Sequence, residues 1–213
     1  LRRQRQMCIR DSPMEDCIES METAFRDYGA NTAVNIPRVR YISKTTNPNM
    51  IYGSNIHIGT TPSYDTAAIR IGGSARGTQP NAQGSQSAKY DNRNWGFICL
   101  IDMQTGQPLA FIQEFFLSGI RVGATSGVAA KYLAAPQAST IGMFGSGKLA
   151  RTDLEALVKV RPIKKVKIYS PTKEHREQFA KEMSQSLEID IEPVDNPQLA
   201  MLEEEIYSHI AIY

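Results

Sequence analysis

A glycine-rich turn between a short apolar run and a helical segment is the stretch of the sequence best suited to binding chemistry. Gly145, Gly147 and Ala150 follow the spacing G-x-G-x-x-A, a variant of the dinucleotide-binding fingerprint. The first glycine permits a tight turn, and the second lets the backbone approach a pyrophosphate. The alanine lets the following helix pack closely on the strand. This spacing predicts a nucleotide site, although glycine turns that bind nothing are common.

The start of the helix after this turn offers groups that bind phosphate. Its free N–H groups and the positive end of the helix dipole attract anions. A second strand-like run, Lys165–Tyr169, ends about 20 residues past the glycines, where a ribose-binding residue is expected. The context therefore favours a dinucleotide over an empty turn. The predicted phosphate-binding residues are Gly145, Ser146, Gly147, Lys148 and Leu149.

No acidic residue stands at the end of that second strand. NAD-specific domains usually carry Asp or Glu there, and such an acid would repel a 2′-phosphate. Ser170 and Thr172 can instead donate hydrogen bonds to a phosphate, and Lys173 adds a positive charge. The sequence thus predicts NADP as the cofactor, with NAD as the second choice. Alternatively, Ser170 and Thr172 only cap the following helix.

Arginines in three other segments are candidates for binding a carboxylate or a phosphate. Arg121 lies in a helix of small residues, Ser118–Ala135, one turn before Thr125. Small residues let a backbone or a ligand come close, and a guanidinium can make a forked contact to an anion. Arg38 and Arg70 lie in two predicted strands. Simple solvation is the alternative for Arg121.

The remaining elements alternate in a way typical of an α/β protein. Apolar residues at three- and four-residue spacing predict a helix from Pro13 to Gly29. A polar stretch, Gly73–Asn94, is expected to be a long loop. Met201–Tyr213 does not read as a further strand. The predicted strands are Val34–Ser43, Met50–Gly59, Ala67–Gly72, a hairpin of Gly96–Asp102 with Pro108–Gln113, Ile141–Phe144 and Lys165–Tyr169.

Composition narrows the function further. Of 213 residues, 41% are hydrophobic and 22% charged, as expected of a globular protein, and the apolar runs are too short to span a membrane. Residues 1–12 carry a net charge of about +3 and resemble a translated artefact or a disordered arm. The positive net charge of the chain therefore lies in this segment, and the charge of the remaining residues does not indicate nucleic-acid binding. The three histidines and three cysteines lack metal-ligand spacing. Unpaired cysteines predict a cytoplasmic protein.

The segments Gly119–Leu133 and Ser139–Gly147 together resemble the ornithine cyclodeaminase/mu-crystallin family, and the likeness runs from about Pro13 to Val194. The resemblance implies a Rossmann-type parallel-sheet domain and an α+β domain for substrate binding and dimerisation, both incomplete here. It implies NAD(P)-dependent chemistry on a small amino or imino acid, and a homodimer. We assign residues 13–135 to the substrate and dimerisation domain and 136–213 to the Rossmann domain.

The resemblance also implies roles for single residues. Arg121 matches an arginine between substrate carboxylate and cofactor, and Arg38 matches a carboxylate-binding arginine, with Arg40 as the alternative. Arg70 stands where amino-acid-converting members have a lysine. Because arginine stays protonated, it does not cycle a proton readily, which argues against ornithine cyclisation.

The family's catalytic aspartate is expected beyond residue 213, so the catalytic residues are unknown from this sequence. The full-length protein is expected to be an enzyme of the cyclodeaminase, ketimine reductase or amino-acid dehydrogenase kind. The rival hypothesis is a non-catalytic NADP-binding protein, like a crystallin or a ligand carrier. Arg70 and the missing aspartate favour that rival.

Overall fold

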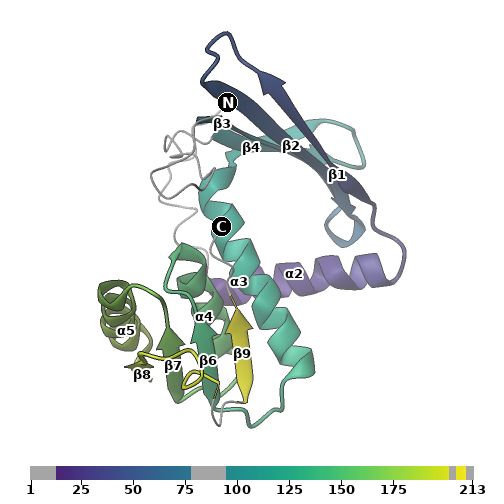
Figure 1. Ribbon diagram of the computed structural model, residues 1–213. Helices are drawn as coiled ribbons and strands as arrows, with labels where there is room; N and C mark the ends of the chain where they lie inside the picture. The colour runs from purple at the N-terminus through teal and green to yellow at the C-terminus, as the bar shows by residue number, and fades with distance from the viewer. Residues whose placement is uncertain (1–12, 78–94, 202–204, 210–213) are drawn as a thin grey trace. The chain divides into compact units, whose positions relative to one another are not determined.

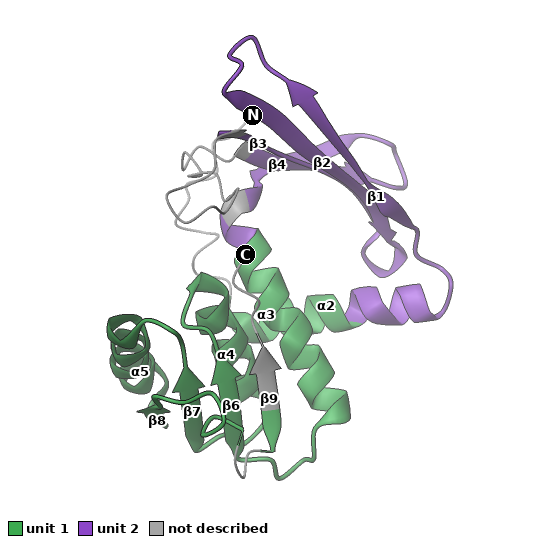
Figure 2. Ribbon diagram, viewed as in Figure 1, with its two compact units in different colours: residues 1–22, 118–213 green, residues 23–117 purple. Residues whose placement is uncertain are grey.

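The computed structural model describes residues 13–77, 95–201 and 205–209, which form α-helices and two β-sheets (Figure 1). The chain divides into two compact units: unit 1 holds residues 1–22 and 118–213, and unit 2 holds residues 23–117 (Figure 2). Two helices, α2 (Met14–Gly29) and α3 (Glu114–Leu133), contribute residues to both units. Most of α3, which we assigned to the substrate domain from sequence, groups with the parallel sheet of unit 1.

Unit 1 is built on a four-stranded parallel sheet with the strand order β8-β7-β6-β9. Short apolar strands alternate with amphipathic helices, which is the pattern that gives a parallel sheet. The structure confirms the predicted Rossmann-type α/β fold. The elements are β6 (Thr140–Phe144), α4 (Lys148–Val160), β7 (Lys165–Tyr169), α5 (Lys173–Leu187), β8 (Asp190–Pro193) and β9 (Ile206–His209).

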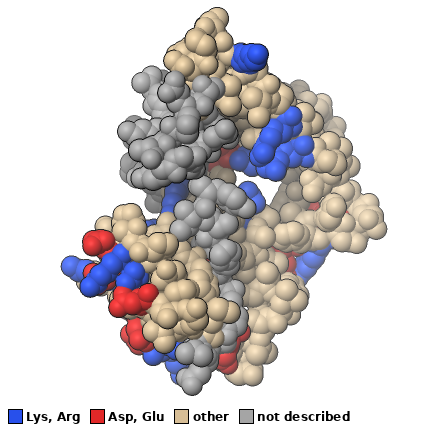
Figure 3. Space-filling view, viewed as in Figure 1, with Lys and Arg blue, Asp and Glu red and all other residues tan. Residues whose placement is uncertain are grey.

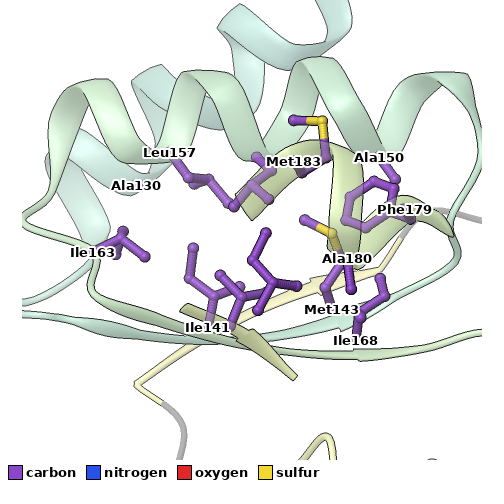
Figure 4. Close-up of a cluster of buried hydrophobic side chains, with 13 residues drawn as sticks. Ala130, Ile141, Met143, Ala150, Leu157, Ile163, Ile168, Phe179, Ala180 and Met183 are labelled. Atoms are coloured by element: carbon purple, nitrogen blue, oxygen red, sulfur yellow. The ribbon is translucent and has the colours of Figure 1, made fainter. Parts of the chain in front are cut away.

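The core of unit 1 lies between this sheet and its helices (Figure 4). Ile141 and Met143 of β6 are fully buried, as is Ile168 of β7. Phe179 and Met183 project from α5 into the same cluster. Burial of large apolar side chains at about 25 cal/mol per Å² is the main stabilising contribution to this packing.

The last strand corrects the sequence prediction. We expected no strand in residues 201–213, but β9 pairs in parallel with β6, Ile206 lying opposite Ile141. Its four residues alternate too little in polarity to be recognised from sequence. The free edge of β6 offers backbone hydrogen bonds to any strand that reaches it, so the pairing depends on the sheet rather than on local preference.

The small residues of α3 let the backbone of α4 come close. A Cβ atom added to Gly123 would lie 2.2 Å from the Thr152 carbonyl oxygen, which is backbone and cannot move aside. The Thr152 hydroxyl also donates a hydrogen bond to the Gly119 carbonyl oxygen (3.0 Å). From sequence, the small residues of this helix could make room for either a backbone or a ligand. The structure shows that the backbone of α4 occupies the space at Gly123.

The same helix packs on α2 one turn further along. A Cβ atom on Gly127 would lie 3.1 Å from the Ile18 side chain. The buried Glu22 carboxylate of α2 accepts hydrogen bonds from Lys131 Nζ and the Tyr132 hydroxyl, both at 2.5 Å. Because a buried carboxylate without partners is costly, these contacts fix α2 against α3.

Unit 2 is a five-stranded antiparallel sheet in which strands follow the chain order β1 to β5. The structure confirms the predicted strands and hairpin. Our expectation that residues 73–94 form one loop is wrong at its start, because β3 continues to Gly77 opposite Met50 of β2; residues 78–94 lie outside the described part. The strands are β1 (Asn35–Lys44), β2 (Met50–Thr61), β3 (Thr66–Gly77), β4 (Trp95–Asp102) and β5 (Pro108–Gln113), with a short 3-10 helix at Pro62–Tyr64.

Across the described ranges, no helix is long and apolar enough to cross a membrane. The same residues contain no group of three or more His, Cys, Asp or Glu side chains placed to hold a metal ion.

We predict that Gly123→Ala lowers the free energy of unfolding by about 1–3 kcal/mol, because the added methyl group forces α3 away from the α4 backbone. Thermal denaturation measures this as a fall of about 2–4 °C for each kcal/mol. Gly29→Ala is the matched control, since a Cβ atom there has nothing within 4 Å. Equal melting temperatures for the two variants would contradict the close helix contact.

Candidate functional site

The glycine turn has the geometry that its sequence predicts. Gly145 has a φ of 97°, a conformation that side chains other than glycine rarely adopt. Its N–H donates to the Tyr169 carbonyl oxygen at 2.8 Å, which ties the turn to the end of β7. The turn is therefore fixed at the carboxyl ends of two adjacent parallel strands, where ligands of open α/β sheets bind.

The first turn of α4 is open to a ligand. Gly147 is the N-cap residue, and as a glycine it makes no side-chain capping hydrogen bond to the helix start. A Cβ atom on Gly147 would have no atom within 4 Å, and the residue itself is exposed. Lys148 is also exposed, while Ser146 and Leu149 are half-buried. This arrangement fits a pyrophosphate, because it brings together open space at Gly147, the N–H groups and dipole of a helix start, and the positive charge of Lys148.

The end of β7 supplies the expected neutral residues, in two different environments. Ser170 is buried, and Thr172 is the exposed N-cap residue of α5. The Thr172 side chain makes no capping hydrogen bond, so its hydroxyl is not committed to the helix. Lys173 is exposed, with Nζ 3.7 Å from a Glu177 carboxylate oxygen. The exposed donors at this edge are thus Thr172 and Lys173.

A buried arginine, Arg176, joins the segments at this edge, and the sequence analysis does not identify it. Its Nη1 donates to the Ser170 carbonyl oxygen at 2.9 Å, and its Nη2 pairs with Asp195. The guanidinium therefore joins the end of β7 to the segment after β8. Its three-residue spacing to the fully buried Phe179 is the signal that could have revealed it.

Arg121 belongs to the same unit as the glycine turn. It is exposed on α3, two residues after Gly119. A Cβ atom on Gly119 would lie 3.7 Å from Lys148 Cε and 3.9 Å from the Leu149 side chain. The turn of α3 that carries Arg121 thus packs against the first turn of α4. Thr125, which we paired with Arg121 from sequence, donates its hydroxyl to the Arg121 carbonyl oxygen at 2.9 Å.

In unit 2, strand register places several polar residues on one sheet face. Arg70 lies opposite His57, and Arg40 lies opposite Asn55. Cross-strand partners share a face, as do residues two apart in a strand, so all four side chains are on the same side. Arg40 Nε donates to Asn55 Oδ1 at 2.8 Å. Arg38 falls in the irregular stretch of β1 between Ile36 and Val39, where the register shifts. Figure 3 shows Lys and Arg side chains over the strands of this unit.

Glu114, the first residue of α3, is a further residue that the sequence analysis does not identify. Its carboxylate forms an ion pair with Arg70 Nη2. The Glu114 side chain is 12% exposed and that of Arg70 31%, so the pair is shielded from water on most sides. Arg70 Nε is buried and has no hydrogen-bond partner among the described residues. No local pattern links residues 70 and 114, since they meet through the sheet and the start of α3.

A model of the Ornithine cyclodeaminase/mu-crystallin family matches residues 3–207. A Delta(1)-pyrroline-2-carboxylate reductase of Bacillus cereus is 45% identical over 85 residues, which is 40% of this chain and 26% of that protein. An iminosuccinate reductase of Paracoccus denitrificans is 27% identical over 157 residues, or 74% of this chain and 45% of that protein.

Among solved structures, the Thermococcus litoralis Delta(1)-pyrroline-2-carboxylate reductase in complex with NADH and L-proline superposes with a TM-score of 0.73 at 29% identity. The match covers 93% of this chain and 58% of that structure. The chain thus spans between about a quarter and three-fifths of the length of these proteins.

We predict that Gly147→Val abolishes dinucleotide binding and leaves the fold intact. The valine side chain has room in the protein but fills the space in front of the α4 N–H groups. Calorimetric titration with NADPH and NADH measures the loss. Gly29→Val serves as the control, because it adds the same side chain in open space at the end of a different helix, α2. Unchanged cofactor affinity in the Gly147 variant would show that the turn does not hold phosphate.

Proposed function

The chain belongs to the ornithine cyclodeaminase/mu-crystallin family, and we propose that it forms the cofactor-binding and substrate-binding part of a nicotinamide-dependent oxidoreductase that acts on a small amino or imino acid. The observation that carries this proposal is the open glycine turn at the start of α4, with Arg121 on the helix packed beside it. A relative with 29% identity and the same fold binds NADH and L-proline.

In this proposal the chain's residues bind and orient, and the bound nicotinamide supplies hydride chemistry at the carbon that carries nitrogen. The N–H groups of Gly147 and Lys148 hold the pyrophosphate. Arg121 donates a forked pair of hydrogen bonds to the substrate carboxylate or to the cofactor. Arg38 is the first candidate for a further carboxylate contact. Arg40 is its alternative, and what supports it is that its hydrogen-bond partner Asn55 is neutral and leaves its positive charge uncancelled.

Arg70 favours imine reduction over cyclodeamination. A guanidinium stays protonated, so it can hold charge in place but cannot take up and release a proton during a reaction. The Glu114 carboxylate holds this guanidinium in an ion pair. We therefore propose a cyclic or linear imino acid as the substrate, of the kind that Delta(1)-pyrroline-2-carboxylate reductases use. The same feature supports the rival hypothesis, a protein that binds cofactor and ligand without turnover.

The experiment that separates these hypotheses uses the intact protein, NADPH or NADH, and Delta(1)-pyrroline-2-carboxylate. An enzyme consumes the reduced cofactor, whereas a carrier binds both molecules without change in absorbance at the nicotinamide band.

We predict that Arg121→Lys weakens substrate affinity by about 1–3 kcal/mol, the contribution of a charged hydrogen bond. Arg151→Lys is the matched control, because Arg151 pairs with Glu182 on the surface of α4 and α5. Wild-type kinetic constants in the Arg121 variant would exclude the proposed contact.

We propose NADP(H) as the preferred cofactor. The support is the absence of an acid at Ser170 and Thr172, the uncommitted Thr172 hydroxyl and the exposed Lys173. A 2′-phosphate needs donors and positive charge, and an acid at this edge would repel it.

We predict that Ser170→Asp and Thr172→Asp each reverse the preference to NADH through charge repulsion. Because Ser170 is buried, the Thr172 variant is the cleaner one: Asp is also a good N-cap residue, so α5 stays intact. Fluorescence titration with NADPH and NADH gives the ratio of the two affinities. Tighter binding of NADH than of NADPH by the unmodified protein would show that the neutral edge does not select NADP.

We propose a homodimer that forms through the second face of the unit 2 sheet. Val39, Ile56, Ile71 and Phe97 are cross-strand neighbours on this face, opposite to the face of Arg70. Several exposed aliphatic and aromatic side chains on one sheet face are typical of an interface, and a second copy of the sheet would cover them. Light scattering of the intact protein at micromolar concentration measures the mass; a monomer would contradict the proposal. The exposed members are Ile36, Val39, Tyr41, Tyr52, Ile58, Phe97 and Phe111.

The free cysteines Cys17 and Cys99 support a cytoplasmic location, which we propose on that ground.

A further inference from the structure

The Arg70–Glu114 ion pair stands out on the polar face of the unit 2 sheet because it differs from the other arginine pair on that face. Arg40 donates to the neutral amide of Asn55, so it keeps its full charge. Arg70 instead faces a carboxylate that is 12% exposed, so its charge is balanced within the protein. Two guanidinium groups on one face thus present different net charges to a ligand.

The sheet is shaped to accept the Glu114 carboxylate. Gly72 and Gly96 are cross-strand partners on the face of Arg70, next to it in β3 and β4. A Cβ atom on Gly96 would lie 2.5 Å from Glu114 Oε2 and 3.2 Å from Glu114 Cβ, and one on Gly72 would lie 4.0 Å from Oε2. The two glycines therefore leave a bare patch of sheet, and the carboxylate occupies it. Glu114 also begins α3, where a negative charge is favoured by the helix dipole.

We propose that Glu114 is a positioning residue that sets the substrate charge this site selects. It holds the Arg70 guanidinium by an ion pair and cancels its charge, so that the face attracts a substrate with one carboxylate and disfavours a second carboxylate beside Arg70. The inference rests on the proposed function, since it takes the face of Arg40 and Arg70 as the substrate surface. It adds the class of substrate, a monocarboxylate amino or imino acid, and the residue that decides it.

The physical reason is that a half-buried ion pair interacts with an incoming anion as a unit. A carboxylate that approaches Arg70 is attracted by the guanidinium and repelled by Glu114 at nearly the same distance. Without Glu114, the same guanidinium would be a full positive charge, partly shielded from water, and a strong site for a second carboxylate.

The test uses the intact protein with its cofactor, and measures the binding of L-proline, with one carboxylate, and of succinate, with two. Glu114→Gln keeps the size and the place of the side chain but removes its charge. We expect succinate affinity to rise about tenfold relative to L-proline affinity in this variant. In the double variant Arg70→Gln, Glu114→Gln, neither residue of the pair is charged. The wild-type preference for L-proline should therefore return.

Glu182→Gln is the matched control, because it removes the carboxylate from another arginine pair, with Arg151, on α4 and α5 of unit 1; its ratio of affinities should equal that of the wild type. Gly96→Ala displaces the Glu114 carboxylate without removing it and should shift the ratio in the same direction as Glu114→Gln, which keeps the test valid if the glutamine variant folds poorly. L-proline binding with an unchanged ratio in both variants overturns this inference and leaves the proposed function standing. Failure of the wild type to bind L-proline or any imino acid overturns both.

Discussion

The contact between α3 and α4 is the constraint on which the nucleotide-binding unit depends. Gly123 lets the two backbones approach so closely that a single methyl group would collide with the Thr152 carbonyl oxygen. This contact fixes the direction of α4, and with it the direction in which the N–H groups after Gly147 point. It also places the turn of α3 that carries Arg121 beside the first turn of α4. One packing contact thus positions both Arg121 and the helix start that we propose for substrate and phosphate binding.

In unit 2, the alternation of side chains along each strand places the arginines and their partners on one face of the sheet and most aromatic residues on the other. One face of its sheet carries Arg40, Asn55, His57 and Arg70 among aliphatic residues such as Ile98 and Ile112, and the other is mainly aliphatic and aromatic. A shift of register by one residue would exchange the two faces and destroy both surfaces at once. Long strands with continuous pairing, such as β2 with β3 over Met50–Thr61, protect against that shift.

Within the polar face, glycine has a role different from the one it has in the turn before α4. At Gly145 it permits a backbone conformation with positive φ. At Gly96 the backbone is an ordinary strand, and the missing side chain makes room for a carboxylate from a distant part of the chain. Glycine thus permits an unusual backbone conformation in unit 1, and in unit 2 it leaves room for another side chain. The surroundings of each glycine in the structure show which of the two roles it has.

Much of this protein follows from the sequence alone, because the signals are local. The G-x-G-x-x-A spacing, the apolar strands on either side of α4, and the hairpin around Gly106 each lie within a few residues. Hydrogen bonds and side-chain periodicity within such short segments give the fold class and the glycine turn before α4. The absence of an acid after β7 is likewise readable, because the residue that meets the ribose is fixed by the length of the strand–helix–strand unit.

Only the tertiary structure decided the rest, since it depends on residues distant in sequence. Strand β9 exists because β6 has an edge to pair with, although its own residues give little sign of a strand. Arg176 is buried because Ser170 and Asp195 meet around its guanidinium. The charge of Arg70 is balanced because the fold brings Glu114, at the start of α3, next to it. The two residues are more than forty positions apart in the sequence, so no local pattern predicts their contact. Sequence patterns report the neighbours of a residue along the chain, and the charge that a guanidinium presents depends on its neighbours in space.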